Sequence, residues 1–495
     1  MTHTALRRQL YREGKRLLGP DRMARLRARS FALGRLAGRQ AARTGDAVRG
    51  RGRGAWLDSL QLEHIDATGL LITGRAVLGS MPLDGAELLI EGEPPIALLP
   101  GLTRFQTQDD RRRRDGNARG FAVLAELPPG RQASPLPARL RLSAGCRRLE
   151  HRLVLPAPAR IDRDPLAQVR SILNRVPAHR DGRRALFDHA FGPAIERLWN
   201  AARQRRAPVD GTLAHYGRPP SGPAPRTSVI VPVYGRCDFI EHQIAHFSFD
   251  PDFADVQLLY VIDDPRLHAS TRALSERLAR CQDLPFSVLY LSRNSGYACA
   301  NNAGARHARG EHLLLLNSDV LPCAPGWLSE MYASLPGPIE GTLLGSRLLY
   351  EDGTLQHDGM RFESADSHEG QWLNRHPGKG LPAELFPAHR LAQPRQAITG
   401  ACLLLARSDW DRLGGLDEAY LLGDFEDSDL CLRARQAGLR IRIATGVTLF
   451  HLERQSQALV SQGRWKEMLT YYNCWYQTRR WHGELTRLTE APAHG

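Results

Sequence analysis

The sequence predicts an α/β protein whose larger, C-terminal part is a doubly wound, mostly parallel β-sheet, preceded by a small β-sandwich and a helical connector. Short alternating or apolar runs separated by Gly, Pro and Asp clusters fill residues 55–159. Apolar residues at helical spacing dominate residues 160–225, which end in the linker GRPPSGPAPR. Apolar strands then alternate with helical stretches over residues 226–495, the pattern of a parallel sheet covered by helices.

Composition fits a globular protein with a sizeable core. The chain has 495 residues, of which 42% are hydrophobic and 24% are charged. Its eight cysteines are scattered without a CxxC pair, which argues against a disulfide framework or a zinc site. No apolar run approaches the roughly 20 residues of a membrane span, and no apolar signal-peptide core is present. We therefore expect a cytoplasmic protein, soluble or peripheral to a membrane.

The positive charge is concentrated at the N-terminus. Residues 1–54 contain 15 basic and three acidic residues, so they carry +12 of the net +14. Their leucines are spaced as in short amphipathic helices, and an Arg-rich amphipathic segment suits an anionic membrane surface. A solvated tail is the alternative. Nucleic-acid binding is less favoured because no aromatic platform or nucleic-acid motif accompanies the charge.

Polar residues close four predicted strands in the C-terminal part. The strands are TSVIVPVYG at 227–235, VQLLYVIDD at 256–264, PFSVLYLS at 285–292 and HLLLLNSD at 312–319. In a parallel sheet the carboxyl ends of the strands meet at one edge, where open α/β folds bind their ligands. Asp319, which follows four consecutive leucines, would therefore lie where a metal or a nucleotide binds.

These motifs resemble bacterial glycosyltransferase family 2. TSVIVPVYG, YVIDD, RNSGYACANNAG, LLLLNSDV, EDGTLQHDGM, the stretch from TGACLLLA to CLRARQAG, and LFHLERQS occur in the order and spacing typical of that family. The resemblance covers about residues 227–482, over half of the chain. It implies a GT-A fold and transfer of a sugar from a nucleoside diphosphate donor with inversion at the anomeric carbon. The β-rich region also resembles accessory sandwich domains of bacterial surface polysaccharide enzymes.

The resemblance implies a divalent cation, Mg²⁺ or Mn²⁺, on the donor diphosphate. The family's Asp-x-Asp motif reads Asn317-Ser318-Asp319 here, so Asp319 keeps the carboxylate expected to reach the metal. Asn317 offers a neutral oxygen and would instead contact the ribose or diphosphate, so a weaker or more hydrated metal site is expected than with two carboxylates. His451 matches a histidine that approaches the metal or diphosphate, with a core histidine as the alternative.

The donor site is expected at the ends of the first two strands and in the loop and helix beside them. Asp263 matches the carboxylate that accepts the base imide N–H, with the adjacent Asp264 as the fallback and an Asp-Pro turn as the structural alternative. The other predicted donor residues are Pro232, Tyr234, Arg293, Asn294, Gly296, Asn302 and Asn317.

The acceptor site needs a general base, because a sugar hydroxyl is a poor nucleophile until its proton is removed. Glu426-Asp427 matches the family's catalytic pair. We assign Asp427 as the base and Glu426 as a residue that orients it or binds the acceptor, with exchanged roles as the alternative. Helix N-capping is the structural alternative for this acid cluster. The predicted acceptor-side residues are Gly400, Asp417 and Trp372, the last either a sugar-stacking platform or a core tryptophan.

The sequence thus predicts an inverting glycosyltransferase that uses a UDP- or dTDP-sugar and a glycan or lipid-linked acceptor, in O-antigen or other surface polysaccharide synthesis. The first alternative is an inactive, transferase-like carbohydrate-binding or scaffold protein, which retention of Asp319, Asp427 and His451 argues against. The second is a nucleotidyltransferase, which would normally carry a glycine-rich, basic phosphate loop after the first strand. VPVYGRCDF is not such a loop.

Overall fold

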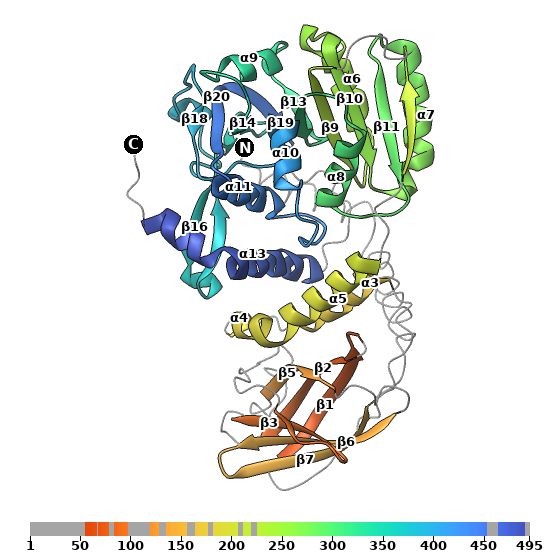
Figure 1. Ribbon diagram of the computed structural model, residues 1–495, viewed down its shortest axis with the longest axis vertical. Coiled ribbons are helices and arrows are strands. Elements are labelled where there is room, and N and C mark those ends of the chain that lie inside the picture. Colours follow the sequence, from red (N-terminus) through yellow and green to blue (C-terminus); the bar gives the residue numbers. More distant parts are fainter. Residues whose placement is uncertain are drawn as a thin grey trace, which may run out of the picture.

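The computed structural model describes the chain from residue 55 to residue 490, with gaps (Figure 1). The described residues are 55–66, 68–78, 84–97, 119–127, 135–155, 164–176, 182–205, 211–218, 225–452 and 464–490. The basic segment 1–54, and with it the predicted membrane contact, lies outside these residues. Within them, no helix combines the length and apolar character needed to cross a membrane.

The N-terminal β domain consists of two antiparallel sheets. One has the order β1-β2-β5 and the other β4-β3-β6-β7. The strands are β1 (Ala55–His64), β2 (Gly69–Leu78), β3 (Gly85–Ile90), β4 (Ile96–Ala97), β5 (Arg119–Glu126), β6 (Leu136–Ala144) and β7 (Arg147–Leu155). Alternate residues of both sheets, such as Ile72 and Leu140, share one apolar cluster. The sequence alternation therefore does produce a small β-sandwich.

Helices from distant parts of the sequence pack together between the sandwich and the large sheet (Figure 1). They are α3 (Pro165–Arg175), α4 (Arg183–Leu186), the π-helix η2 (Phe187–Phe191), α5 (Gly192–Arg205) and the C-terminal α13 (Arg464–Glu490). Tyr472 and Trp475 of α13 join Phe187 and Phe191 in one apolar cluster. The connector therefore depends on the C-terminal helix for its core.

The large sheet has eleven strands. Nine follow the order β13-β20-β14-β19-β12-β9-β10-β11-β8, while β15 pairs with β14 and β18 with β20. The strands are β8 (Gly211–Tyr216), β9 (Thr227–Val233), β10 (Val256–Ile262), β11 (Phe286–Leu291), β12 (His312–Leu316), β13 (Val320–Pro322), β14 (Thr342–Leu349), β15 (Leu355–His357), β18 (Gln393–Pro394), β19 (Cys402–Ala406) and β20 (Arg440–His451). The predicted connector, 160–225, thus ends in a strand, β8, which pairs antiparallel with β11 and closes that edge.

Two groups of strands in the described large sheet are paired in parallel. The strands β12, β9, β10 and β11 are mutually parallel in that spatial order, and β14 is parallel to β20. Antiparallel pairing joins these two groups through β19, which lies between β12 and β14. The carboxyl ends of the four strands predicted from the sequence therefore share one edge, and β14 and β20, which point the same way as β12, end at that edge too.

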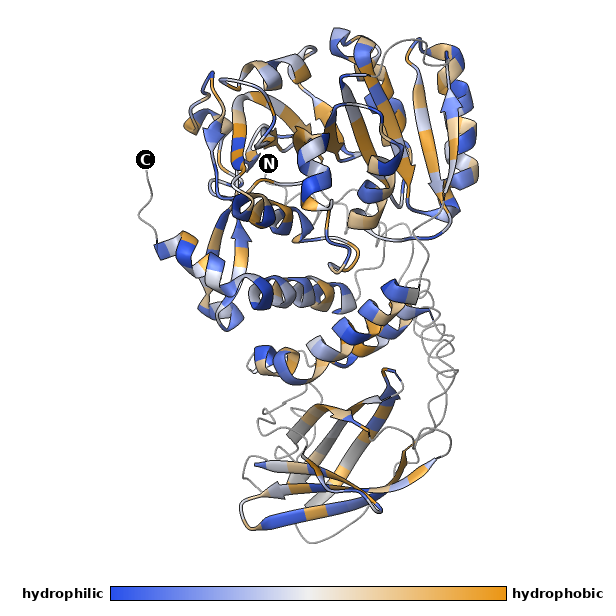
Figure 2. Ribbon diagram, viewed as in Figure 1, coloured by the Kyte–Doolittle hydropathy of each residue, from blue (hydrophilic) through white to orange (hydrophobic). Residues whose placement is uncertain are grey.

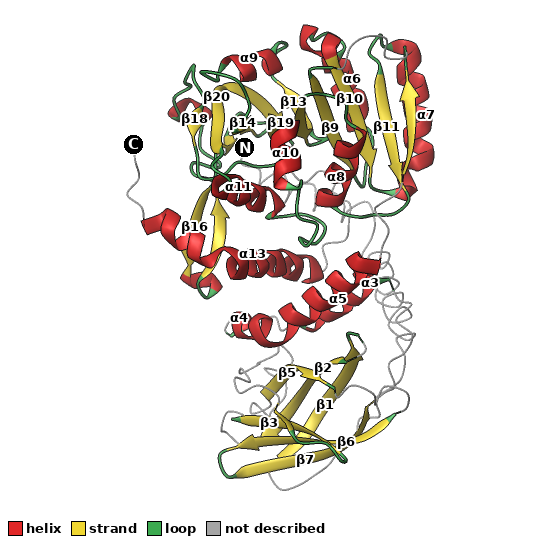
Figure 3. Ribbon diagram, viewed as in Figure 1, coloured by secondary structure: helices red, strands yellow, loops and turns green. Residues whose placement is uncertain are grey.

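Helices cover both faces of the sheet, which confirms the predicted α/β fold class (Figure 3). They are α6 (Phe239–Phe247), α7 (His268–Cys281), α8 (Tyr297–His307), α9 (Trp327–Ala333), α10 (Arg407–Leu413) and α11 (Glu426–Gln436), with 3₁₀ turns at η3 (Pro251–Asp255), η4 (Pro265–Leu267), η5 (Asp366–His368) and η6 (Ala383–Leu385). Val229 and Val231 of β9 face one core while Ile230 faces the other. Apolar residues accordingly dominate the central strands (Figure 2).

A separate hairpin, β16 (Arg361–Ala365) and β17 (Gln371–Arg375), leaves the sheet and packs on α13. Trp372 of β17 donates its backbone N–H to the Thr478 hydroxyl, and its indole N–H lies 3.2 Å from His482 Nδ1. These contacts hold the hairpin on the C-terminal helix.

Candidate active site

The carboxyl ends of β9, β10 and β12 position the first group of predicted site residues. Asp263 follows β10 directly, and its backbone N–H donates to the Val233 carbonyl at 2.9 Å. Its side chain is only 4% exposed, and its two oxygens accept the N–H groups of Ser295 and Gly296 at 2.7 and 2.8 Å. Burial raises the pKa of Asp263 to about 8, although both N–H groups act in the opposite direction. Asp263 therefore anchors the turn that begins α8.

The neighbouring Asp264 is held by its own turn. It is 2% exposed, and its carboxylate accepts from the Arg266 side chain at 2.7 and 2.8 Å and from Gly235 N–H at 3.3 Å. Burial acts to raise the pKa of Asp264, but the Arg266 contacts outweigh it and the pKa is lowered. Arg266 also lies over the Tyr234 ring, at 5.9 Å from the ring centre. Tyr234 and Asp264, both predicted on the donor side, are thus joined through one arginine.

The residues predicted for the metal meet at one point. His451 Nε2 lies 3.3 Å from Asp319 Oδ1 and 3.3 Å from Asn317 Nδ2. Strand register explains this meeting, because Val320 of β13 is directly opposite His451 of β20. Asn317 Oδ1 is buried and has no hydrogen-bond partner among the described residues. Arg236 is close enough for its charge to interact with Asp319, which the sequence motifs did not indicate.

This donor set fits a divalent cation that is shared with a ligand. It offers one carboxylate, one imidazole and the unpaired amide oxygen of Asn317, which are oxygen and nitrogen ligands that Mg²⁺ and Mn²⁺ accept. Within the described part of the chain, no group of three or more His, Cys, Asp and Glu side chains is arranged to hold a metal. The remaining ligands would therefore come from a diphosphate and water.

The predicted catalytic pair begins α11. Asp427 is half-buried, and one of its oxygens accepts the Gly400 N–H at 3.0 Å and the other the Ser428 N–H at 2.7 Å. Glu426 is 5% exposed, and its Oε2 has no hydrogen-bond partner among the described residues. Burial raises the pKa of both carboxyls, and the nearby charge of Asp427 raises that of Glu426 further. Asp427 is thus the member of the pair that remains partly open to solvent.

The two clusters adjoin through the residues before β19. Gly400 N–H binds Asp427, while the next carbonyl, that of Ala401, accepts the Asn317 N–H at 3.0 Å. Asn317 and Asp427 are therefore bound to consecutive residues. A side chain would crowd its neighbours at Gly400, because a Cβ there would lie 2.9 Å from the Tyr297 hydroxyl and 3.5 Å from Asp427 Cβ.

The loop before α11 has a strained backbone. Leu422, Asp424 and Phe425 have φ angles of 60°, 80° and 77°, in the left-handed region that non-glycine residues avoid. Asn473 of α13, fully buried, accepts the Leu421 N–H at 3.0 Å and donates to the carbonyls of Leu421 and Gly423 at 3.0 and 2.7 Å. The C-terminal helix therefore holds the conformation that places Glu426 and Asp427.

Tyr297 connects this loop to the donor side. Its backbone N–H donates to the Leu422 carbonyl at 2.9 Å, and its hydroxyl donates to the Gly400 carbonyl at 2.7 Å. The adjacent Gly296 has φ of 89°, and a Cβ there would lie 2.7 Å from Leu422 Cα. Gly296, predicted as a donor-site residue, thus allows close approach of the loop that leads to Glu426 and Asp427.

Two further predicted site residues, Asn302 and Asp417, bind neighbouring parts of the protein. Asn302 uses its side chain on the loop after α10: Oδ1 accepts the Leu416 N–H, and Nδ2 donates to the Leu416 carbonyl and Glu418, each at 2.9 Å. Asp417 pairs with Arg480 and accepts the Ala419 N–H at 2.8 Å, so it joins this loop to α13. These side chains hold the framework around the site.

Trp372 fits the core alternative and not the stacking platform. It is 6% exposed and belongs to an apolar cluster with Met360 and Phe362, so its ring face is covered by protein. Pro232, Arg293 and Asn294 are half-buried, and the charge of Arg293 acts on Asp263.

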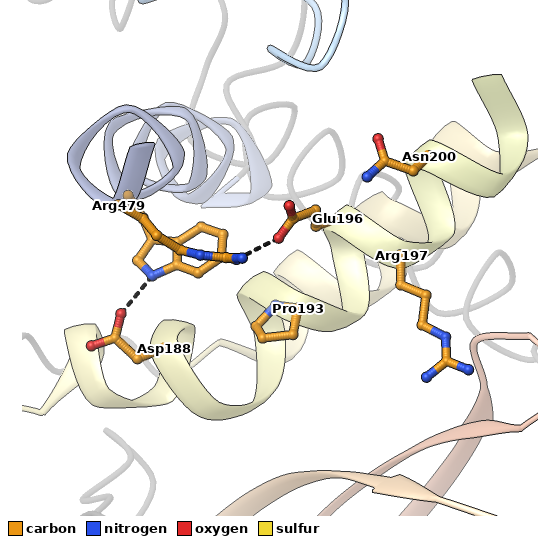
Figure 4. A pocket seen from close by; sticks show the side chains of 7 residues that line it. Asp188, Pro193, Glu196, Arg197, Asn200 and Arg479 are labelled. Atoms are coloured by element: carbon orange, nitrogen blue, oxygen red, sulfur yellow. Dashed lines mark hydrogen bonds and ion pairs between the residues drawn. The ribbon is translucent and has the colours of Figure 1, made fainter. Parts of the chain in front are cut away.

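A pocket of about 560 Å³ lies elsewhere, between the connector and α13 (Figure 4). It is lined by Asp188, Pro193, Glu196, Arg197, Asn200, Trp475 and Arg479. Its polar groups bind each other across the two elements: Asp188 accepts from the Trp475 indole at 2.7 Å, and Glu196 accepts from Arg479 at 2.5 Å. The pocket shares no residue with the strand-end clusters, and its polar side chains stabilise the packing of helices.

Comparison with known proteins identifies the class. Residues 228–388 match the family model described as Glycosyl transferase family 2, which confirms the family recognised from the motifs for this segment. The chain is 29% identical over 301 residues to the O-antigen biosynthesis protein RfbC of Myxococcus xanthus, covering 59% of this chain and 22% of that protein. It is 30% identical over 294 residues to the uncharacterized protein y4gI of Sinorhizobium fredii, covering 57% of this chain and 30% of the other.

The match to glycosyl transferase family 2 thus covers residues 228–388, and the chain spans less than a third of the length of these two relatives. Among solved structures, it is similar to the mannosyltransferase PcManGT of Pyrobaculum calidifontis in complex with GDP-Man and Mn²⁺. The identity is 18%, the TM-score is 0.35, and the similarity covers 66% of this chain and 88% of that one.

Proposed function

We propose that this protein is an inverting glycosyltransferase that moves a sugar from a UDP- or dTDP-sugar to a hydroxyl of a glycan or lipid-linked acceptor in surface polysaccharide synthesis. One observation carries the proposal: Asn317 and Asp427 bind the consecutive residues Ala401 and Gly400. A cluster suited to a diphosphate and its cation therefore adjoins a partly exposed carboxylate suited to activating a hydroxyl.

The residues have distinct roles in the proposed reaction. Asp427 takes the proton of the acceptor hydroxyl as its oxygen bonds to the anomeric carbon, and the bond from that carbon to the diphosphate oxygen breaks. This single displacement inverts the anomeric centre. Asp427 is kept in place by Gly400 N–H, and burial keeps its pKa raised, which makes it a stronger base than a free carboxylate. Glu426, with an unpaired buried oxygen, would orient the acceptor.

Asp319, His451 and the amide oxygen of Asn317 are the residues that would hold Mg²⁺ or Mn²⁺. When bound, the cation would stabilise the negative charge that develops on the leaving diphosphate. Arg236 adds positive charge near Asp319, and Arg293 adds it near Asp263. The turn of Asp263 with Ser295 and Gly296 would shape the pocket for the base.

Location and partners complete the proposal. All eight cysteines are free, as expected in a reducing compartment. The charge of residues 1–54 supports a contact with the anionic inner face of a membrane. The relative named for O-antigen biosynthesis supports an acceptor of the surface polysaccharide type.

The test is a donor screen on the purified full chain. UDP-, dTDP- and GDP-sugars are offered with Mg²⁺ or Mn²⁺, release of nucleoside diphosphate is measured, and the anomeric configuration of any product is read by NMR. We expect release from one donor class and inversion in the product. An inactive scaffold would bind without release in every combination, and a product of retained configuration would exclude Asp427 as the base of a single displacement.

A further inference from the structure

Gln356 makes a two-point contact with His451 that fixes the orientation of both side chains. It is 5% exposed and lies in β15, beside the edge of β14. Its Nε2 donates to the His451 carbonyl at 3.1 Å, and its Oε1 lies 2.6 Å from His451 Nδ1. A carbonyl oxygen only accepts hydrogen bonds, so the NH₂ end of the amide must face it and Oε1 must face the ring.

This orientation determines which imidazole nitrogen carries the proton. Oε1 of Gln356 can only accept, so Nδ1 of His451 must donate and therefore bears the hydrogen. In the neutral ring, Nε2 then has a free lone pair, which can accept from Asn317 Nδ2 at 3.3 Å.

The lone pair of Nε2 also faces the carboxylate of Asp319. Nε2 and Asp319 Oδ1 are 3.3 Å apart, and with the proton on Nδ1 both atoms are electron donors with no hydrogen to share. Two such donors side by side are arranged as two ligands of one cation. In protein metal sites the second ring nitrogen of a ligating histidine is commonly held by a hydrogen-bond acceptor, which sets the tautomer and the ring orientation.

We propose that Gln356 is a positioning residue of the cation site: it holds His451 in the tautomer that presents Nε2 to the metal. The inference rests on the proposed cation site and adds a residue that belongs neither to the segment Asn317-Ser318-Asp319 nor to the strand that carries His451. The next residue, His357, accepts the Thr399 N–H at 3.3 Å, and the Thr399 hydroxyl binds Asp427. One short strand therefore supports the cation cluster and the catalytic carboxylate.

Loss of the amide has a specific chemical consequence. In Gln356→Met the side chain keeps its approximate size, but Nδ1 loses its acceptor. The tautomer with hydrogen on Nε2 then gains a hydrogen bond to Asp319 Oδ1, and that hydrogen occupies the position where the cation would bind. We expect Mn²⁺ affinity to fall about 10- to 100-fold, the usual effect of removing such a partner of a ligand.

The experiment measures Mn²⁺ binding by electron paramagnetic resonance on the full chain, with and without UDP. Gln356→Met is compared with Gln356→Glu, which keeps an acceptor for Nδ1, and with Gln168→Leu, a buried glutamine of α3 remote from the site. We expect weakened binding in Gln356→Met, binding nearer to that of the unchanged protein in Gln356→Glu, and no effect of Gln168→Leu. Thermal unfolding of each variant reports on folding separately.

A second readout addresses the tautomer itself. Nitrogen-15 NMR of the histidine rings, with the His451 signals assigned by their loss in His451→Asn, should show hydrogen on Nδ1 in the unchanged protein and on Nε2 in Gln356→Met.

The outcomes distinguish failure of the proposed cation site from failure of the proposed role of Gln356. Absence of Mn²⁺ binding in the unchanged protein, with and without UDP, would overturn the cation site and this inference together. Unchanged affinity in Gln356→Met, even with lowered thermal stability, would overturn the role of Gln356 alone, as would hydrogen on Nε2 of His451 in the unchanged protein.

Discussion

The hydrogen bonds from Asn473 of α13 to the loop before α11 allow a quantitative prediction. Asn473→Ala removes three hydrogen bonds, to Leu421 N–H and to the carbonyls of Leu421 and Gly423. A typical intramolecular hydrogen bond contributes about 1 kcal/mol, and buried backbone groups left unpaired cost more. We therefore expect the free energy of unfolding to fall by about 3–5 kcal/mol.

The same change should lower turnover more than donor affinity. Residues in the left-handed region cost about 1–3 kcal/mol each and persist only where the surrounding structure enforces them. Without Asn473, Leu422 and Phe425 can relax, and Asp427 would lose its position relative to Gly400. The assay combines denaturant unfolding, steady-state rates and calorimetric donor binding.

Thr470→Val is the matched control, because it removes one exposed hydrogen bond from the same helix to the same loop, that of the hydroxyl with Asp424 at 2.7 Å. It should cost less than about 1 kcal/mol and leave turnover nearly unchanged. If Asn473→Ala is as stable and as active as Thr470→Val, the conformation of the loop does not depend on the hydrogen bonds of Asn473, and the reasoning is refuted.

Three further predictions concern the cation site, the pH profile and the N-terminus. Asp319→Ala should reduce turnover by orders of magnitude while leaving the thermal unfolding temperature nearly unchanged, and a variant of near-normal activity would remove Asp319 from the site. Because burial raises the pKa of Asp427, the decline of kcat/KM with falling pH should have its midpoint above the ordinary aspartate value of 3.8; a profile flat down to pH 4 would exclude it as the base. Deleting residues 1–54 should weaken binding to anionic vesicles in a salt-sensitive way and spare activity on a soluble acceptor, whereas equal vesicle binding by both forms would contradict the membrane contact.

The local patterns of the sequence were sufficient for the fold class, whereas the site residues were assigned through the family resemblance and their roles remain predictions. Apolar runs that end in polar residues gave the strands β9, β10 and β12, because a fully buried parallel strand needs apolar residues on both faces. The structure places Asp319 and His451, which the resemblance assigned to one metal, 3.3 Å apart, because Val320 of β13 pairs with His451 of β20.

Contacts between distant segments could not be predicted in this way. Nothing in the local sequence indicates that Asn473 binds a loop some fifty residues earlier, or that Leu422 and Phe425 adopt positive φ angles usually reserved for glycine. Asn302 illustrates the same limit: its motif matched a donor-binding asparagine, but its three hydrogen bonds hold the loop after α10. Trp372 was ambiguous because a tryptophan suits both a sugar platform and a core, and only its burial distinguishes the two.

The site also contains residues whose roles are visible only in three dimensions. Tyr297 and Gln356 lie in motifs that the sequence comparison with the family had marked, yet their spacing gave no reason to assign them a role. The structure shows that the hydroxyl of Tyr297 holds Gly400 and that the amide of Gln356 holds His451. Both act through another residue, and such roles have no signature in residue spacing.

The most direct test of the central claim separates acceptor activation from donor binding in Asp427→Asn. This change keeps the size of the side chain and much of its hydrogen bonding but cannot accept a proton. Steady-state rates and calorimetric titration with the nucleotide-sugar are measured on the same preparation, with Glu426→Gln alongside to test whether the roles are exchanged. We predict that kcat falls by about a hundredfold or more while donor affinity barely changes. Normal turnover of Asp427→Asn, or loss of donor binding in step with the rate, would contradict the assignment and leave this carboxylate as an ordinary residue of a helix N-terminus.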